Sequence, residues 1–413
     1  MTAHELGLQA ATTLMLCLLV GVGSVILSDV LGRFVPVPAV VLEILGGILL
    51  GPAVLGIAHD NAVVSAFSEL GLALLMFLAG YEIQLPRVAG DPLRSAVRGW
   101  AGSLLVGLGA GILIVELARP EDGLTAGTML GLLFTTTALG TILPILRDTG
   151  DAETSFGSFI LSAGAVGEFG PIVAIALLLS GDSPWHTVLV LVVFVVVAAI
   201  VFRLAQRRHP ERLASLLRRT LSSSGQLGVR TAMLLVLFMV WVAAELGLDV
   251  LLGAFTAGLV ARYFLSGADD ETHEATMARI EGVGFGLMIP IFFVVSGIRF
   301  DLDALLSDVG AMLLVPISLV LFLVIRGVPT HLSLGRSLAG RDRIGAAVYA
   351  STALPLIVVI TGIGVDDGTL KPATAAAFVG AGMLSVLIFP LAATRLRGGQ
   401  ADTGTYPDAS DAL

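Results

Sequence analysis

Apolar runs of about 20 residues recur along this chain from its first residues to position 395. A helix of about 20 apolar residues spans a hydrocarbon core about 30 Å thick, so each run is long enough to cross a membrane. Of the 413 residues, 56% are hydrophobic and 13% are charged. Soluble domains carry about 25% charged residues, so a water-soluble fold is excluded. The sequence predicts an all-α polytopic membrane protein.

Charged and Pro/Gly-rich joints divide the sequence into thirteen apolar segments, each of which predicts one transmembrane helix. In chain order, these predicted helices cover residues 7–32, 37–55, 64–84, 95–117, 124–146, 156–180, 185–207, 229–247, 250–265, 282–298, 309–330, 343–363 and 371–395.

The basic residues predict the orientation of the chain. With the N-terminus outside, 19 of the 23 Lys and Arg residues fall in loops on the inner side. Inner loops of membrane proteins are enriched in Lys and Arg, so we expect an inner (plasma) membrane protein with a cytoplasmic C-terminus. The transmembrane domain covers residues 1–395. Residues 396–413 are small, polar and acidic, which predicts a disordered cytoplasmic tail.

Matching pieces in the two halves predict two inverted repeats. Gly80 and Gly297 end similar segments, and Thr137 with Ala138 recurs as Thr352 with Ala353, 215 residues later. An odd number of helices separates the pieces, so the equivalent helices run in opposite directions, as in many transporters. Chance recurrence of Gly, Thr and Pro is the alternative for either piece alone.

Prolines inside the predicted helices indicate broken helices. A proline leaves the carbonyl four residues earlier without its helical donor, and here Pro144, Pro171 and Pro355 do so. Unwound backbone at membrane depth is tolerated only where it is buried or lines a cavity. The fifth and twelfth helices are therefore predicted to be discontinuous and crossed, although simple kinks are the alternative. Backbone carbonyls and four hydroxyls would then face a dehydrated cation: Thr136, Thr137, Ser351 and Thr352.

Two charged residues lie inside the predicted helices, where each costs about 2.5 to 3.5 kcal/mol. Glu168 lies midway along the sixth helix among small residues. Burial disfavours the charged carboxylate, so this side chain can hold either a proton or a monovalent metal cation. Arg326, late in the eleventh helix, stays charged and is expected to balance or orient a buried carboxylate, unless it snorkels to the surface. Glu43 and Glu82, nearer helix ends, are weaker candidates.

Several functions are excluded by what the sequence lacks. Cys17 is the single cysteine, and no catalytic Ser/His/Asp set or metal cluster converges at membrane depth. We therefore expect neither an enzyme nor a cofactor, and nothing suggests a nucleic acid partner.

Three segments together resemble the membrane domains of the monovalent cation/proton antiporter superfamily, which includes sodium/proton exchangers and potassium-efflux antiporters. They are residues 42–52 (LEILGGILLGP), 72–83 (LALLMFLAGYEI) and 290–297 (PIFFVVSG). The resemblance implies a two-domain transporter. Its core would comprise residues 95–180 and 309–395, its dimerisation helices residues 7–84 and 229–298, and its linker helix residues 185–207.

The resemblance also implies an ion site. The family's two acidic positions on the sixth helix map to Gly167 and Glu168, and its basic residue on the eleventh helix maps to Arg326. Because Gly167 carries no carboxylate, this chain departs from members with paired aspartates. One carboxylate that exchanges one proton for one cation predicts electroneutral exchange.

The expected function is secondary active exchange of Na⁺ or K⁺ for protons by alternating access, with Glu168 as the shared carrier. A homodimer in the lipid bilayer is expected from the resemblance and from small residues in the second and ninth helices. Two alternatives stay open: a channel-like conduit for potassium efflux, and an organic-solute transporter of a related fold.

Overall fold

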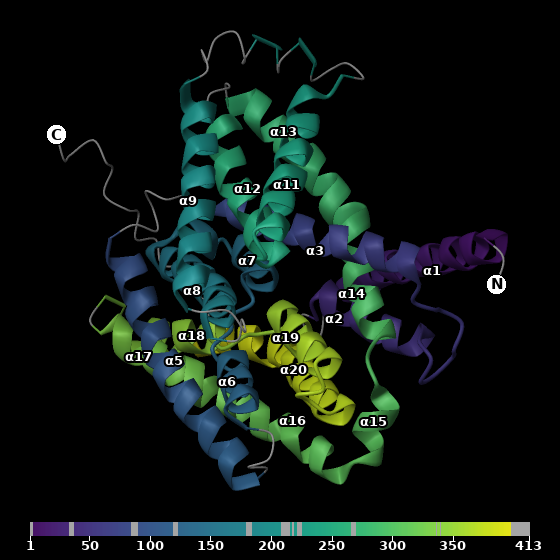
Figure 1. Ribbon diagram of the computed structural model, residues 1–413, viewed down its shortest axis with the longest axis vertical. Helices are drawn as coiled ribbons and strands as arrows, with labels where there is room; N and C mark the ends of the chain where they lie inside the picture. Colours follow the sequence, from purple (N-terminus) through teal and green to yellow (C-terminus); the bar gives the residue numbers. More distant parts are fainter. Residues whose placement is uncertain are drawn as a thin grey trace. The chain divides into compact units, whose positions relative to one another are not determined.

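The computed structural model describes residues 3–32, 37–83, 90–118, 123–178, 184–207, 215–216, 219–220, 225–265, 270–335, 337–338 and 340–397. The predicted tail, residues 396–413, lies almost entirely outside these ranges. The chain divides into two compact units, which are described separately (Figure 1). Unit 1 comprises residues 1–33, 42–83 and 180–299, and unit 2 comprises residues 34–41, 84–179 and 300–413.

Unit 1 is built from helices only in its described residues. They are α1 (Ala3–Gly32), α2 (Ala39–Leu50, mostly in this unit), α3 (Ala62–Glu82), α9 (Pro184–Arg207), α11 (Leu227–Glu245), α12 (Val250–Leu265), α13 (Asp270–Val283), the π-helical turn η3 (Gly284–Met288) and α14 (Ile289–Ile298). Asn61 caps α3 by accepting the N–H groups of Val63 and Val64 at 3.1 Å.

Close backbone approach holds this unit together, because glycines replace side chains where helices cross. A Cβ on Gly258 of α12 would lie 2.0 Å from the carbonyl oxygen of Phe77 on α3. A Cβ on Gly47 of α2 would lie 2.0 Å from the carbonyl oxygen of Val294 on α14. Small residues in membrane proteins commonly let helices approach in this way. Gly47 and Gly258, on the second and ninth predicted helices, therefore pack within the chain, and the homodimer stays a prediction.

The regular elements of unit 2 are also all helices in its described part. Its elements are α5 (Asp91–Ala118), α6 (Gly123–Leu133), α7 (Leu139–Asp148), the 3₁₀ turn η2 (Asp151–Glu153), α8 (Ser155–Leu178), α15 (Leu302–Ser307), α16 (Val309–Leu321), the π-helical turn η4 (Phe322–Gly327), α17 (Val328–Leu334), α18 (Gly340–Ala350), α19 (Pro355–Asp366) and α20 (Pro372–Arg397).

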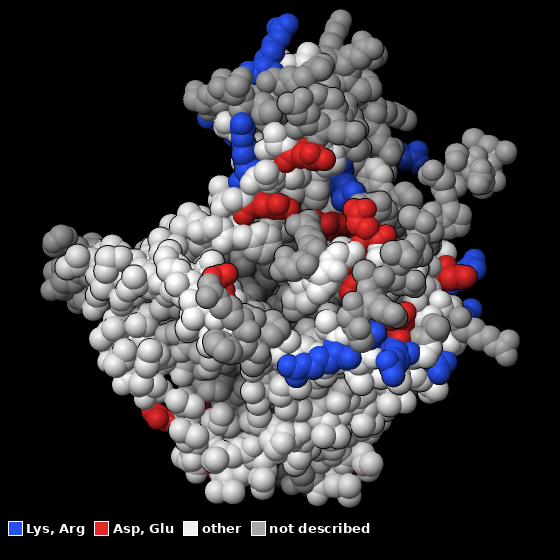
Figure 2. Space-filling view, turned by 180° about the vertical axis from the view of Figure 1, so that it is seen from behind, with Lys and Arg blue, Asp and Glu red and all other residues white. Residues whose placement is uncertain are grey.

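The all-helical membrane class is confirmed. The described residues contain nine helical stretches long and apolar enough to cross a membrane and four shorter apolar helices. Every segment predicted from the sequence contains a described helix. The count of thirteen spans, the inverted repeats, the domain roles and the orientation stay predictions. On the face seen in Figure 2, charged side chains gather in patches and leave wide uncharged areas, which suits a surface in lipid.

Several helices extend beyond their predicted limits, and two of them show why. The tenth was predicted to begin at residue 282, but helical structure begins at Asp270 and continues through η3 into α14. The eleventh was predicted to end at residue 330, but α17 continues to Leu334. The physical reason is that apolarity marks the part of a helix that meets lipid, whereas backbone hydrogen bonding continues into polar sequence such as α13.

Candidate functional site

The fifth and twelfth predicted helices are both interrupted. Helix α6 ends at Leu133 and α7 begins at Leu139, while α18 ends at Ala350 and α19 begins at Pro355. Every residue in the two intervening segments is buried. The predicted discontinuity is therefore confirmed, and a continuous kinked helix is excluded at both places.

The two interruptions contact each other through hydrogen bonds. The backbone N–H of Ala138 donates to the carbonyl oxygen of Thr352 at 2.7 Å, and the hydroxyl of Thr137 donates to the carbonyl oxygen of Ala350 at 2.6 Å. Backbone groups freed from one broken helix are thus satisfied by the other, as buried polar groups require. Thr137 and Thr352 therefore both lie at this crossing.

Helix α8 joins this crossing through the residue before Glu168. The carbonyl oxygen of Gly167, which Pro171 leaves without a helical donor, accepts the backbone N–H of Thr137 at 3.0 Å. A Cβ at position 167 would lie 2.4 Å from the hydroxyl oxygen of Thr137 and 2.7 Å from Nη2 of Arg326. Any larger residue at this position requires Thr137 or Arg326 to move.

Glu168 is 1% exposed, and neither carboxylate oxygen has a hydrogen bond of normal geometry among the described residues. The backbone N–H of Leu139 lies near it, although this N–H donates to the carbonyl oxygen of Thr137 at 3.2 Å. Leu139 is the first residue of α7, so the carboxylate faces the positive end of a helix dipole. An ionised carboxylate has about four lone-pair sites, and those of Glu168 are open. This arrangement can hold a proton or a dehydrated cation.

Arg326 lies in the π-helical turn η4 and is 0% exposed, so the snorkelling alternative is wrong. Its Nε donates to the hydroxyl of Thr137 at 2.8 Å, Nη2 to the carbonyl oxygen of Ala163 at 2.8 Å, and Nη1 to the hydroxyl of Thr330 at 3.2 Å. No carboxylate forms an ion pair with it among the described residues, and its expected role of balancing or orienting a buried carboxylate stays a prediction. The guanidinium is oriented by neutral acceptors instead.

The other candidate hydroxyls divide into two kinds. Those of Thr136 and Ser351 donate to carbonyl oxygens of their own helix ends, Leu133 at 3.0 Å and Ala347 at 2.9 Å. The hydroxyl of Thr352 is buried and has no partner among the described residues. Thr352 is therefore the candidate hydroxyl that stays available to a ligand.

The two weaker acidic candidates lie in unit 1. Glu43 is on α2 and is buried, and Glu82 ends α3 and is half-buried. Among the described residues, no group of three His, Cys, Asp or Glu side chains could hold a metal ion.

Sequence reasoning missed Ser385, which lies in the middle of α20. Its hydroxyl oxygen accepts the backbone N–H of Ala353 at 3.0 Å and lies 2.9 Å from the carbonyl oxygen of the same residue. The serine thus satisfies the N–H of an unwound residue, while its single hydroxyl proton is shared between the carbonyl oxygens of Ala353 at 2.9 Å and Gly382 at 2.7 Å. The available signal was a lone hydroxyl at the centre of an otherwise apolar helix.

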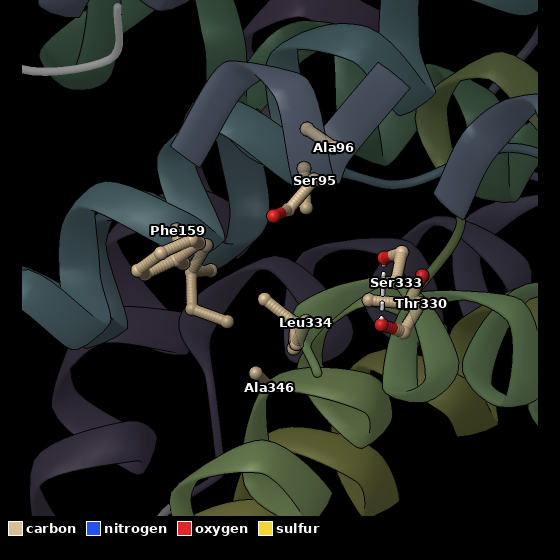
Figure 3. A pocket seen from close by; sticks show the side chains of 9 residues that line it. Ser95, Ala96, Phe159, Thr330, Ser333, Leu334 and Ala346 are labelled. Carbon is tan, nitrogen blue, oxygen red and sulfur yellow. Dashed lines mark hydrogen bonds between the residues drawn. The ribbon is translucent and has the colours of Figure 1, made fainter. Parts of the chain in front are cut away.

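A small cavity in unit 2 borders two of the partners of Arg326. It is lined by Thr330 and Ala163, with Ser95, Phe159 and Ser333 among the other residues. In Figure 3 the hydroxyl of Ser95 points into the space between Phe159 and the Thr330–Ser333 pair. Glu168 does not line this cavity.

A pair of crossed, broken helices beside a buried carboxylate defines a class: a helical membrane transporter with its site at unwound backbone. Residues 16–396 match the family model described as "Sodium/hydrogen exchanger, transmembrane". The chain belongs to this family, which is a family of transporters.

Curated relatives agree with this assignment. The chain is 26% identical over 384 residues to a Na⁺/H⁺ antiporter of Enterococcus hirae, an alignment that covers 91% of this chain and 95% of the relative. It is 25% identical over 364 residues to the Na⁺/H⁺-K⁺ antiporter GerN of Bacillus cereus, an alignment that covers 86% of this chain and 88% of the relative. For the putative Na⁺/H⁺ antiporter YjbQ of Bacillus subtilis the identity is 23%, and the alignment covers 87% of this chain but only 59% of the relative.

The fold also matches a solved structure. The sodium proton antiporter MjNhaP1 of Methanocaldococcus jannaschii has a TM-score of 0.66 against this chain, with 95% of this chain and 97% of that chain covered. The sequence identity is 16%, so this match concerns the fold.

Proposed function

We propose that this protein is a secondary active antiporter that exchanges a monovalent cation, Na⁺ or K⁺, for protons, with Glu168 as the shared carrier. The observation that carries the proposal is the Glu168 carboxylate, which is buried near the first residue of α7 and has no hydrogen-bond partner in the part of the chain that the structure describes. A buried carboxylate within a membrane commonly marks an ion or proton path. The relatives named as Na⁺/H⁺ antiporters and as a Na⁺/H⁺-K⁺ antiporter support the same chemistry.

Exchange follows from competition for one carboxylate. Protonated Glu168 is neutral and its site is closed to a cation, whereas ionised Glu168 attracts one. The orphaned hydroxyl of Thr352 and the unwound carbonyls of the crossing are the proposed additional ligands. Because Gly167 supplies no second acid, one proton is exchanged for one cation and the reaction is electroneutral. Alternating access then exposes the same site to the two sides in turn.

Arg326 is proposed to balance the charge of Glu168 without touching it. Its guanidinium stays ionised, and the bonds to Thr137, Ala163 and Thr330 hold it in place. A fixed positive charge in a low-dielectric region favours the ionised form of a nearby carboxylate. A homodimer stays part of the proposal on the family resemblance alone.

The test is cation-induced proton movement in everted vesicles and in proteoliposomes, measured separately for Na⁺, K⁺ and Li⁺. Glu168→Gln removes the charge and the exchangeable proton with little change of volume, and should abolish exchange while the protein still inserts. Full exchange by Glu168→Gln would move the carrier elsewhere, with Glu43 or Glu82 next. Cation flux without opposing proton flux would favour a channel-like conduit, and flux of an organic solute would favour a transporter of that class.

A further inference from the structure

A second buried charge cluster lies in unit 2, apart from the Glu168 site. Arg397 ends α20, and its Nη1 donates to Oδ2 of Asp151 at 2.5 Å while its Nε donates to Oδ1 of Asp342 at 2.7 Å. Its guanidinium also lies over the ring of Phe156, 3.5 Å from the ring centre. The Arg397 and Asp151 side chains are 4% and 6% exposed.

This cluster joins the ends of the two broken helices. Asp151 follows the end of α7, and Asp342 lies in the first turn of α18. The other ends of α7 and α18 meet at the crossing, where Ala138 donates to Thr352. Helices of 10 and 11 residues are about 15 Å long, so α7 and α18 are tied together at both ends, about 15 Å apart.

The space between the two ties is filled by apolar side chains. One buried cluster contains Ile142 and Leu146 of α7, Tyr349 of α18 and Ala393 of α20. The hydroxyl of Tyr349 lies 3.0 Å from that of Thr394, one turn before the end of α20. Because close-packed interiors transmit displacement, a shift at Arg397 is passed along these helices to the crossing.

Stability alone is a weak explanation for the cluster. Burying an ion pair costs desolvation energy that its attraction often fails to exceed, so apolar residues would stabilise the fold as well. Moreover, Oδ1 of Asp151 and Nη2 of Arg397 are buried and have no hydrogen bond among the described residues. An ion pair with these unmade hydrogen bonds is better explained by fixing the relative positions of the helices than by stabilising the fold.

We infer that Arg397 is a positioning residue for ion exchange, which sets the spacing of α7 and α18 and through them the placement of the crossing beside Glu168. The inference rests on the proposed function of Glu168. According to this inference, the C-terminal end of α20 controls cation affinity at a site that Arg397 does not contact.

The experiment compares the apparent KM for the cation in proteoliposomes of the full chain. Maximal rates are normalised to the amount of inserted protein. Arg397→Gln should raise this KM about tenfold, because small misplacements of binding groups are costly. Arg397→Lys should give an intermediate rise, since an ammonium group cannot reproduce the two-sided fork. The matched control is Arg395→Gln in the same helix turn, where the side chain is exposed and the KM should change by less than about twofold.

An unchanged KM for Arg397→Gln, with only a loss of inserted protein, would overturn the inference and leave Arg397 a structural residue. If the Arg397→Gln protein does not insert, the Asp342→Asn variant is measured in its place. The Asp342 side chain is 27% exposed, and this substitution removes only one ion pair. A raised KM for Asp342→Asn supports the inference and an unchanged KM overturns it. Glu168→Gln is measured in parallel: exchange that survives this substitution overturns the proposed carrier, an outcome that none of the Arg397 variants produces.

Discussion

The backbone N–H of Thr137 donates a 3.0 Å hydrogen bond to the carbonyl oxygen of Gly167, the residue immediately before Glu168. This bond links an unwound segment of one broken helix to a helix whose own donor is removed by Pro171. It places the proposed carrier beside the crossing, and the predictions below concern the contacts around it.

Gly167→Ala should lower kcat/KM for the cation about tenfold to a hundredfold, a loss expected from displacements near 1 Å in a binding site. The added methyl group would lie 2.4 Å from the Thr137 hydroxyl and 2.7 Å from Nη2 of Arg326, so one of them must move. Transport assays in proteoliposomes measure the loss. Gly109→Ala is the control, because a Cβ there meets nothing within 4 Å. Equal rates for both variants would contradict the geometry.

Cation affinity should weaken as pH falls. A lower pH protonates a larger fraction of Glu168, and the apparent KM then approaches a rise of about tenfold per pH unit, by mass action at one shared site. Initial rates over a grid of pH and cation concentration test this. The maximal rate at saturating cation should recover at low pH. A KM that stays constant while only the maximal rate falls would indicate separate proton and cation sites.

Arg326→Ala should impair exchange and move its pH profile to higher pH. Without the buried positive charge the protonated form of Glu168 is favoured, so a higher pH is needed to free the site for a cation. Lost hydrogen bonds to a charged group also cost about 1.5 to 3 kcal/mol each, and Arg326 makes three. Rates as a function of pH are the measurement. Arg299→Ala, which breaks an exposed pair with Asp60, should leave the profile in place.

Cysteines at positions 137 and 352 should cross-link in a Cys17→Ala background. The crossing joins Ala138 to Thr352 by a 2.7 Å hydrogen bond, which brings the neighbouring Thr137 within reach of a short thiol cross-linker. Mass spectrometry of peptides identifies the link. The control pair replaces Thr137 and Thr128, since Thr128 lies on α6 five residues before that helix ends and bonds within its own helix. A link in the control pair alone would contradict the observed crossing.

Much of the crossing could be predicted from particular residues. Pro355 located the second interruption, because proline lacks the donor that a helix needs and α19 begins there. The first interruption was expected from Pro144, but it lies before α7, and α7 continues through Pro144. Pro171 correctly indicated that the carbonyl of Gly167 would be free, and the depth of Glu168 in an apolar run indicated its burial. The partner of Arg326 was not predictable, since several buried acceptors compete for a guanidinium and only the packing of three helices selects among them.

Local chemistry along the sequence by itself determined the membrane class, the broken helices and the identity of the buried charges, because apolar length and missing donors act within one segment. Tertiary structure alone decided which groups meet. It paired Arg326 with neutral oxygens, assigned Ser385 to the unwound Ala353, and brought Arg397 to Asp151 and Asp342. The reason is that partners far apart in the chain are chosen by the spacing of packed helices, which no local pattern of residues records.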